Sequence, residues 1–168
     1  SPIRLVAPTH WLADSAASSS VLGGQHIRVI PNPLAPEFEE VPAATPPTPG
    51  DGEDRLVVGV VAADLTDPVK NVVEAVTAFT QARKTNARLE LRLVGARGEE
   101  HSNVGDLLGV LTASELRSFY AQCDALIMPS LAENGPLVIA EAGSQGCKTF
   151  ARKTGGNGEM IQRAGRGS

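Results

Sequence analysis

The sequence has few cysteines, few histidines and no long apolar run, and each shortage excludes a class of protein. Its two cysteines, Cys123 and Cys147, can build no disulfide framework and form no Cys-x-x-Cys pair, which favours a reduced, cytoplasmic setting. The three histidines, His10, His26 and His101, lie in separate segments and show no metal-ligand spacing. No apolar run approaches the ~20 residues that span a bilayer. The sequence therefore predicts no metal site and no membrane-spanning helix.

Familiar catalytic and nucleic-acid-binding signatures are missing as well. The sequence contains no Gly-x-Ser-x-Gly elbow and no Walker phrase. The net charge is −4, and six acidic residues fall between Pro31 and Asp54, where Lys and Arg are absent. The remainder carries 15 basic residues against 13 acidic ones, without the clustered basic face of a nucleic-acid-binding protein. We expect no nucleic-acid partner, whereas the mildly positive remainder can hold a small anionic ligand.

A length of 168 residues favours a single domain, residues 1–168, which we divide into three parts. In the entry segment (1–30), residues 3–8 and 26–31 predict strands around a helix that Thr9 caps and Gly23-Gly24 end. The second part (31–54) is acidic and contains seven prolines, which exclude a helix or a central strand. The core (55–168) predicts alternating strands and helices.

The core alternation indicates the fold class. Strands are predicted at 55–62, 88–96, 124–130 and 147–153, with helices at 67–84, 112–123, 136–146 and 155–165. Residues 104–109 are a short apolar segment that fits either type. This order favours an α/β, Rossmann-like domain of three layers, with a parallel sheet and helices on both faces. Ligands of such sheets bind beyond the carboxyl ends of the strands, here the turns after Ala62, Gly95 and Ser130.

A Gly-Pro pair inside the stretch "AENGPLVIAEAGSQG" (residues 132–146) predicts the start of a helix at that edge. Pro136 suits the first helical position, and Gly146 suits the end. The N–H groups of Gly135, Leu137 and Val138 would then be unpaired donors at a positive dipole end. Such a helix start can receive a phosphate.

Two glutamates flank this Gly-Pro pair, and they need an explanation. Glu133 lies at the mouth of the predicted helix, and Glu141 lies inside an otherwise uncharged run. Burying an unpaired carboxylate costs several kcal/mol, so Glu141 must reach solvent or meet a donor such as a sugar diol. The pattern alone leaves open whether Glu141 is a ligand-binding residue or a solvated side chain.

Two further segments are candidates for anion binding. Lys70 is predicted in the first turn of the helix that follows strand 55–62, where a cation opposes the helix dipole and can instead pair with a ligand. The segment Lys153–Ile161, "KTGGNGEMI", places glycines before a helix but lacks the full Gly-x-Gly-x-x-Gly spacing. An ordinary surface lysine and a plain loop are the alternatives at these two sites.

Four phrases follow one another along the chain: "APTHWLAD…IRVIPNPL", "VVAADLTDPVKNVVEAVTAF", "GVLTASELRSFYAQCDALIMPSLAENGPLVIAEAGSQG" and "GGNGEMI". Together, in this order, they resemble the C-terminal half of a GT-B glycosyltransferase of family 4 (glycosyl transferases group 1). The third contains a glutamate-seven-residues-glutamate motif. The resemblance covers nearly the whole chain and implies a domain that binds a nucleotide-sugar donor.

The resemblance also implies roles for individual residues. Lys70 would hold the donor diphosphate, and Glu133 would lie near the donor sugar. The backbone of residues 135–137 (Gly135, Pro136 and Leu137) would face the sugar and phosphates. Glu141 would accept hydrogen bonds from the ribose hydroxyls. The implied reaction transfers a sugar from a nucleoside diphosphate sugar with retention of configuration, without an essential metal or other cofactor.

The resemblance implies partners and a setting too. The acceptor site and a catalytic histidine would belong to an N-terminal domain that this chain lacks. We therefore expect a fragment that is inactive alone, and we assign no catalytic residue beyond the sugar contact of Glu133. Polysaccharide or glycoconjugate assembly in the cytoplasm is expected. A lipid-linked acceptor would bring the full-length protein to the inner face of the membrane as a peripheral protein.

Three positions depart from the family pattern. Many relatives carry arginine where this chain has Asp64, glycine where it has Asn71, and an aromatic residue where it has Asn134. The first departure removes a cation from the expected diphosphate site. An alternative function is therefore a non-catalytic binding or interaction domain with the same fold. An unrelated signalling receiver would need an acidic cluster, for which Asp64 and Asp67 are the nearby residues.

Overall fold

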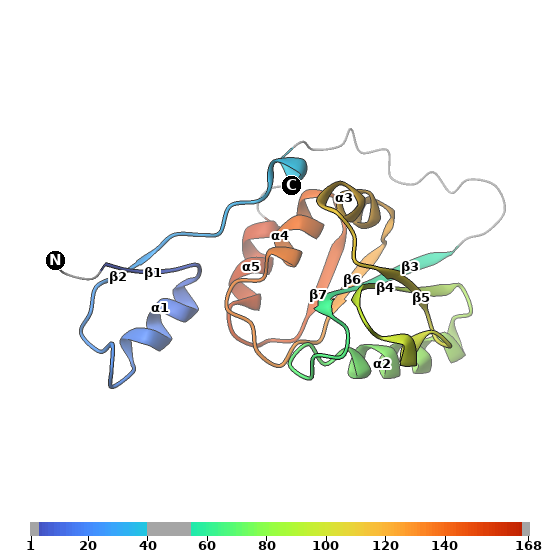
Figure 1. Cartoon of the computed structure of the whole chain (residues 1–168), viewed down its shortest axis with the longest axis horizontal. Coiled ribbons are helices and arrows are strands. Elements are labelled where there is room, and N and C mark those ends of the chain that lie inside the picture. Colours follow the sequence, from blue (N-terminus) through green and yellow to red (C-terminus); the bar gives the residue numbers. More distant parts are fainter. Residues whose placement is uncertain (1–3, 40–54, 166–168) are drawn as a thin grey trace.

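A five-stranded parallel sheet forms the centre of the molecule (Figure 1). The computed structural model describes residues 4–39 and 55–165. The strand order is β5-β4-β3-β6-β7, and every pairing within this sheet is parallel. The strands are β3 (Leu56–Asp64), β4 (Leu89–Ala96), β5 (Asp106–Gly109), β6 (Ala125–Met128) and β7 (Lys148–Ala151). The predicted parallel sheet is confirmed, and the apolar segment 104–109 supplies its edge strand β5.

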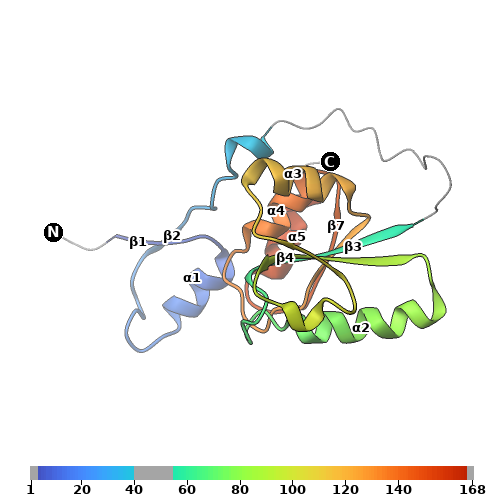
Figure 2. The same cartoon turned by 45° about the vertical axis from the view of Figure 1, so that its right-hand side comes forward.

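Helices cover both faces of this sheet, as the alternation predicts (Figures 1 and 2). They are α2 (Val72–Thr85), α3 (Ala113–Gln122), α4 (Leu137–Ser144) and α5 (Asn157–Ala164). Val58 and Val60 of β3 pack in one apolar cluster with Phe79 of α2. Val57 and Val61, which point to the opposite face, pack with α3 and α4. Because β3 is covered on both faces, its sequence is almost entirely apolar.

Two predicted helices differ from the structure at their ends. The helix expected from residue 67 begins only at Val72, because Asn71 before it has the left-handed conformation with φ of 53°. Lys70 therefore lies in the turn before α2, and its placement in the first helical turn is wrong. Helix α1 (His10–Ala17) has the predicted Thr9 cap but ends well before Gly23-Gly24. A turn region occupies residues 18–24.

The entry segment forms a small lobe beside the main sheet (Figure 1). Strands β1 (Leu5–Ala7) and β2 (Ile27–Val29) pair in parallel in a separate two-stranded sheet, with α1 between them in sequence. In the proline-rich part, residues 36–39 contain a 3-10 turn, η1 (Pro36–Phe38), which the prolines were expected to exclude. Phe38 is buried against the ring of Tyr120. The rest of this part, residues 40–54, lies outside the described residues.

Candidate functional site

Two loops at the carboxyl edge of the sheet bring Lys70 and Glu133 together. Lys70 belongs to the loop between β3 and α2, and Glu133 to the loop between β6 and α4. The Lys70 Nζ lies 2.6 Å from Glu133 Oε1, with side-chain exposures of 30% and 11%. The loops also meet through their backbones, because Leu131 N–H donates to the Val69 carbonyl at 2.8 Å. Two residues that the sequence singled out separately thus form one ion pair.

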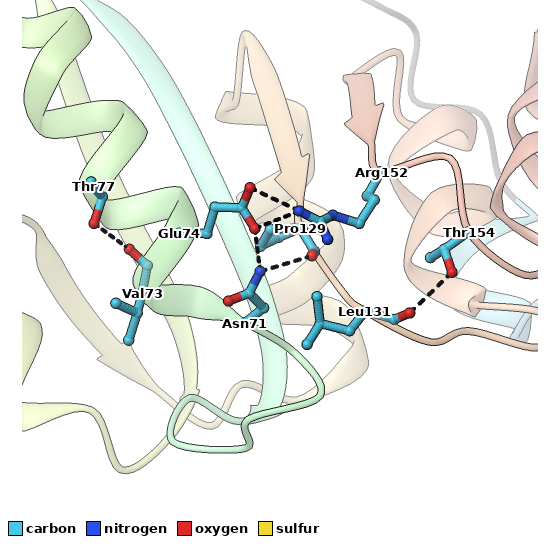
Figure 3. A network of polar contacts seen from close by, with 8 residues as sticks. All are labelled: Asn71, Val73, Glu74, Thr77, Pro129, Leu131, Arg152 and Thr154. Atoms are coloured by element: carbon cyan, nitrogen blue, oxygen red, sulfur yellow. Dashed lines mark hydrogen bonds and ion pairs between the residues drawn. The ribbon is translucent and has the colours of Figure 1, made fainter.

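A polar network in the neighbouring turns joins the start of α2 to the ends of β6 and β7 (Figure 3). Arg152, directly after β7, donates from Nη2 to both carboxylate oxygens of Glu74 at 2.9 Å. Glu74 in turn accepts from the Asn71 side-chain amide. The same amide reaches the Pro129 carbonyl at 3.4 Å. The turn before α2 is therefore connected to the ends of both β6 and β7.

The segment Glu133–Gly135 is supported from its other side by the entry lobe and by the turn before α5. Thr9 Oγ1 donates to the Asn134 carbonyl at 2.8 Å, and Asn32 Nδ2 to the Gly135 carbonyl at 3.3 Å. Gly156 N–H donates to the Glu133 carbonyl at 2.9 Å. These backbone contacts fix the course of the segment while the Glu133 carboxylate faces Lys70.

The glycines at 155 and 156 are needed for this close approach. A Cβ on Gly155 would lie 1.7 Å from the Glu133 carbonyl oxygen, and φ of +51° there already disfavours other residues. A Cβ on Gly156 would lie 2.1 Å from the Asn134 carbonyl oxygen. The segment "KTGGNGEMI" is therefore a support for the Glu133 loop. The structure favours this packing role over the phosphate cradle considered from the sequence.

Helix α4 begins beside the Lys70–Glu133 pair. Pro136 is its N-cap, with extended φ and ψ of −69° and 120°, so the predicted start is one residue too early. The first helical residue is Leu137, and no side chain caps this end. The positive end of α4 is thus directed at the same edge of the sheet as Lys70. Gly135, Pro136 and Leu137 all lie at this helix start, as the sequence predicts.

Glu141 lies a turn further along α4, where its partner is a residue that sequence reasoning missed. Tyr120 of α3, which is fully buried, donates its hydroxyl to Glu141 Oε2 at 3.0 Å. Burial raises the pKa of the Glu141 carboxyl, and the hydrogen bond from Tyr120 opposes that rise. Burial and the nearby Glu141 raise the pKa of Tyr120 above its ordinary value, so Tyr120 remains a donor. Glu141 is therefore half-buried and paired, which favours a specific role over a freely solvated side chain.

The position that departs from the family pattern, Asp64, is neutralised by a second residue that the sequence did not single out. Arg97, directly after β4, forms an ion pair with Asp64 and also donates from Nε at 3.1 Å. Thr66 donates its N–H and its hydroxyl to the same carboxylate, at 2.9 and 2.7 Å. Asp67 instead accepts from the Val69 N–H at 2.8 Å. The two aspartates serve the loop, and a receiver-type acidic cluster is not formed.

Residues 4–39 and 55–165 contain no group of three or more His, Cys, Asp or Glu side chains arranged to hold a metal ion. Within the same ranges, no helix combines the length and the apolar character that a bilayer crossing requires.

Comparison with solved structures identifies the fold. WaaG, a glycosyltransferase involved in lipopolysaccharide biosynthesis, superimposes with a TM-score of 0.76 at 16% identity, covering 96% of this chain and 47% of WaaG. Sucrose-phosphate synthase from Thermosynechococcus elongatus gives a TM-score of 0.65 at 19% identity, over 90% and 41% of the two chains. The pneumococcal O-GlcNAc transferase GtfA, in complex with UDP and GlcNAc, gives 0.65 at 16% identity, over 90% and 31%. The chain thus spans less than half the length of these proteins.

A family comparison adds the sequence evidence. The family model described as "Glycosyl transferases group 1" matches residues 50–168, which include the Lys70, Glu133 and Glu141 segments. No curated protein sequence matches the chain. The resemblance to the C-terminal domain of a GT-B enzyme is confirmed by the family match and the shared fold. The chain belongs to the group 1 glycosyl transferases and has the α/β fold of the C-terminal domain of their GT-B architecture.

Proposed function

We propose that this chain is the donor-binding part of a retaining glycosyltransferase that transfers a sugar from a nucleoside diphosphate sugar. The observation that carries the proposal is the meeting of Lys70 and Glu133 beside the uncapped start of α4. A lysine ammonium has three donors, so Lys70 can share one with Glu133 and offer others to a diphosphate. The free N–H groups of the α4 start supply further donors for the same anion.

Glu141 completes the site for the nucleoside. The Tyr120 hydroxyl occupies Oε2 of this carboxylate, and no side chain or backbone group of residues 4–39 and 55–165 forms a hydrogen bond with Oε1. A half-buried carboxylate with one oxygen fixed is suited to accept from a pair of vicinal ribose hydroxyls. In this arrangement Lys70 and the α4 start bind the diphosphate, Gly135 to Leu137 line it, Glu133 faces the sugar and Glu141 the ribose. The proposal assigns no role to a metal or another cofactor.

The remaining parts of the proposal concern the whole enzyme. The acceptor, a glycan or a lipid-linked or other molecule, would bind an N-terminal domain that closes on this edge of the sheet. Polysaccharide or glycoconjugate assembly in the cytoplasm, with peripheral association at the inner face of the membrane, fits this activity. The chain alone would bind the donor weakly and would not catalyse transfer.

A non-catalytic nucleotide-sugar-binding domain is the second candidate, and the Asp64–Arg97 pair favours it. Asp64 neutralises part of the positive charge of Arg97. The diphosphate site therefore carries less positive charge than Lys70 and an unpaired Arg97 would give it. A full-length protein that binds the donor but shows neither hydrolysis nor transfer across an acceptor panel would support this candidate.

Titration of the chain with UDP, GDP and ADP, followed by isothermal calorimetry, tests the proposal. We expect weak binding of one of these nucleotides. Lys70→Ala and Glu141→Ala should each lower the affinity by about tenfold or more, since each removes a charge-assisted hydrogen bond worth roughly 1.5–3 kcal/mol. Lys84→Ala, an exposed lysine in the last turn of α2, is the matched control and should bind like the wild type.

Two results would contradict the proposal. One is the absence of binding to all three nucleotides at millimolar concentration. The other is binding that neither Lys70→Ala nor Glu141→Ala weakens. Retention of configuration is tested separately, by following the anomeric proton of the product formed by the full-length enzyme.

A further inference from the structure

Asn71 takes a conformation and a set of partners that a helix cap does not require. Its φ of 53° is left-handed, which costs most residues about 1 kcal/mol or more and which asparagine tolerates better than most. Asparagine at an N-cap usually accepts from an N–H of the first helical turn. Here the side chain makes no such bond to α2. The amide instead bonds the Glu74 side chain in the first turn of α2 and the Pro129 carbonyl after β6, so its contacts extend beyond the helix.

These other contacts cross-link the loop that carries Lys70 (Figure 3). The Asn71 amide bonds the Pro129 carbonyl at 3.4 Å and the Glu74 carboxylate. Arg152 Nη2 donates to both carboxylate oxygens of Glu74 at 2.9 Å. One residue before Lys70, the Val69 carbonyl accepts from Leu131 N–H at 2.8 Å. The backbone of Lys70 is therefore anchored to the β6–α4 loop on both sides.

The β6–α4 loop is held at the same point from β7. The Leu131 carbonyl accepts from Thr154 Oγ1 at 3.0 Å, two residues after Arg152 (Figure 3). Lys70 and Glu133 thus extend from two segments that are tied to each other and to the end of β7. A lysine side chain has several rotatable bonds, so the place its ammonium group occupies depends on how firmly its backbone is fixed.

The network adds little to the stability of the fold. The side chains of Arg152 and Glu74 are 43% and 51% exposed. Exposed ion pairs contribute a median of about 0–1 kcal/mol, and here a single guanidinium nitrogen, Nη2, makes both contacts to Glu74. An asparagine whose side chain accepted a hydrogen bond from the first turn of α2 would stabilise that helix equally well. This exposed ion pair, joined to a left-handed asparagine beside Lys70, therefore affects the geometry of the loop more than the stability of the fold.

We propose that Asn71, Glu74 and Arg152 are positioning residues that hold the Lys70 ammonium beside Glu133 for the donor diphosphate. The inference rests on the proposed donor site and extends it to residues outside that site. The three act through the backbone of Lys70. Loss of any one leaves the anchor incomplete.

Two substitutions test the network without disturbing the fold. Asn71→Gly keeps the left-handed backbone free of strain and removes the amide. Arg152→Gln removes the charge that holds Glu74. Each purified chain is titrated with the nucleoside diphosphate that the wild type binds best among UDP, GDP and ADP, and with the corresponding monophosphate. Arg83→Gln, an arginine in the last turn of the same helix α2, is the matched control.

We expect each network variant to weaken diphosphate binding about fivefold, the loss typical of one net hydrogen bond. Binding of the monophosphate should change much less, because Lys70 is assigned to the diphosphate. The melting temperature should stay at the wild-type value. The double variant should be little worse than either single one, since both substitutions break the same chain of contacts.

The outcomes separate this inference from the proposed function. If Lys70→Ala weakens diphosphate binding while Asn71→Gly and Arg152→Gln do not, the network has no positioning role. Equal losses for the monophosphate and the diphosphate would also overturn it, because they would indicate a general disturbance. A wild-type chain that binds none of the nucleotides would overturn the proposed function, and this inference with it.

Discussion

The hydrogen bond between Tyr120 and Glu141 makes the stability of this domain depend on pH in a specific way. Tyr120→Phe removes one hydroxyl from a fully buried side chain and leaves Glu141 Oε2 without the 3.0 Å donor. A hydrogen bond to a charged group contributes about 1.5–3 kcal/mol, whereas a bond between neutral groups contributes about 0.5–1.5 kcal/mol. We therefore expect a loss of about 2 kcal/mol when Glu141 is ionised and about 1 kcal/mol when it is protonated.

The direction of the pH dependence follows from the pKa of Glu141. Burial raises this pKa above the ordinary carboxyl value. Between the ordinary value and the raised one, the folded protein binds more protons than the unfolded chain, so wild-type stability falls as pH rises. In Tyr120→Phe the hydrogen bond that opposes the rise is lost, so the pKa of Glu141 moves further upward. The free-energy cost of Tyr120→Phe should therefore be about 2 kcal/mol at pH values above the pKa of Glu141 in the variant, where Glu141 is ionised. It should fall towards about 1 kcal/mol as the pH drops and Glu141 becomes protonated.

Urea unfolding of the wild type and Tyr120→Phe across the acidic to neutral range measures this cost. Near neutral pH, a loss of about 2 kcal/mol corresponds to a fall of about 4–8 °C in melting temperature for a chain of this size. The double variant with Glu141→Gln supplies the control, because it cannot ionise. In that background Tyr120→Phe should cost about the neutral value at every pH. A cost that does not vary with pH, or that is equal in both backgrounds, would refute the reasoning.

Two further predictions concern Gly156 and Glu159, which lie at the start of α5. Gly156→Ala should destabilise the domain by about 1–3 kcal/mol, because its Cβ would lie 2.1 Å from the Asn134 carbonyl oxygen. Gly158→Ala has no atom within 4 Å of its Cβ and should be neutral or slightly stabilising; equal urea midpoints for the two variants would contradict the packing argument. Glu159→Ala should cost about 0.5–2 kcal/mol, since Glu159 Oε2 caps α1 by accepting from His10 N–H at 2.7 Å. An unchanged free energy of urea unfolding would show that this cap contributes nothing.

The sheet could be predicted because its strands carry a strong local signal. A strand buried on both faces, such as β3, is almost entirely apolar, and the sequence offers Thr112 or Ser114 as the cap of α3, of which the structure uses Thr112 in a capping box with Glu115. Helix ends were harder to predict. The α1 helix ends early because the Ser18 and Ser19 hydroxyls bond back to carbonyls of the last turn, at 2.7 Å each.

The start of α2 was misplaced for a similar reason. The segment from Asp67 has helical spacing of its valines, but Asp67 binds the Val69 N–H and Asn71 is left-handed. These two features form a turn that periodicity does not reveal. Lys70 is nevertheless a candidate site residue from the sequence, because a cation near a helix start opposes the helix dipole and because its phrase resembles that of the family.

The sequence predicts the individual residues of the candidate site, but it does not predict which side chains form ion pairs or hydrogen bonds with them. Lys70, Glu133 and Glu141 belong to phrases that stand out in the sequence. Their partners do not: Tyr120 has the appearance of a core aromatic, and Arg97 and Arg152 that of surface cations. Pairing across the sheet depends on the register of strands far apart in sequence, and a single sequence carries no signal for it. An arginine directly after a predicted strand is the feature that could have drawn attention to Arg97.

The charges at this edge of the sheet determine how a diphosphate can bind there. Three carboxylates already hold three cations, in the pairs Lys70–Glu133, Glu74–Arg152 and Asp64–Arg97. An incoming diphosphate must therefore compete with a carboxylate for each of these three cations. Lys70 is the cation whose partner lies only three residues before the N-cap of α4, so a phosphate that takes it also gains the free N–H groups of that helix start. The competition thus favours Lys70 over Arg97, whose partner Asp64 ends β3, whereas Arg152 also has a helix start beside it because Glu74 lies in the first turn of α2.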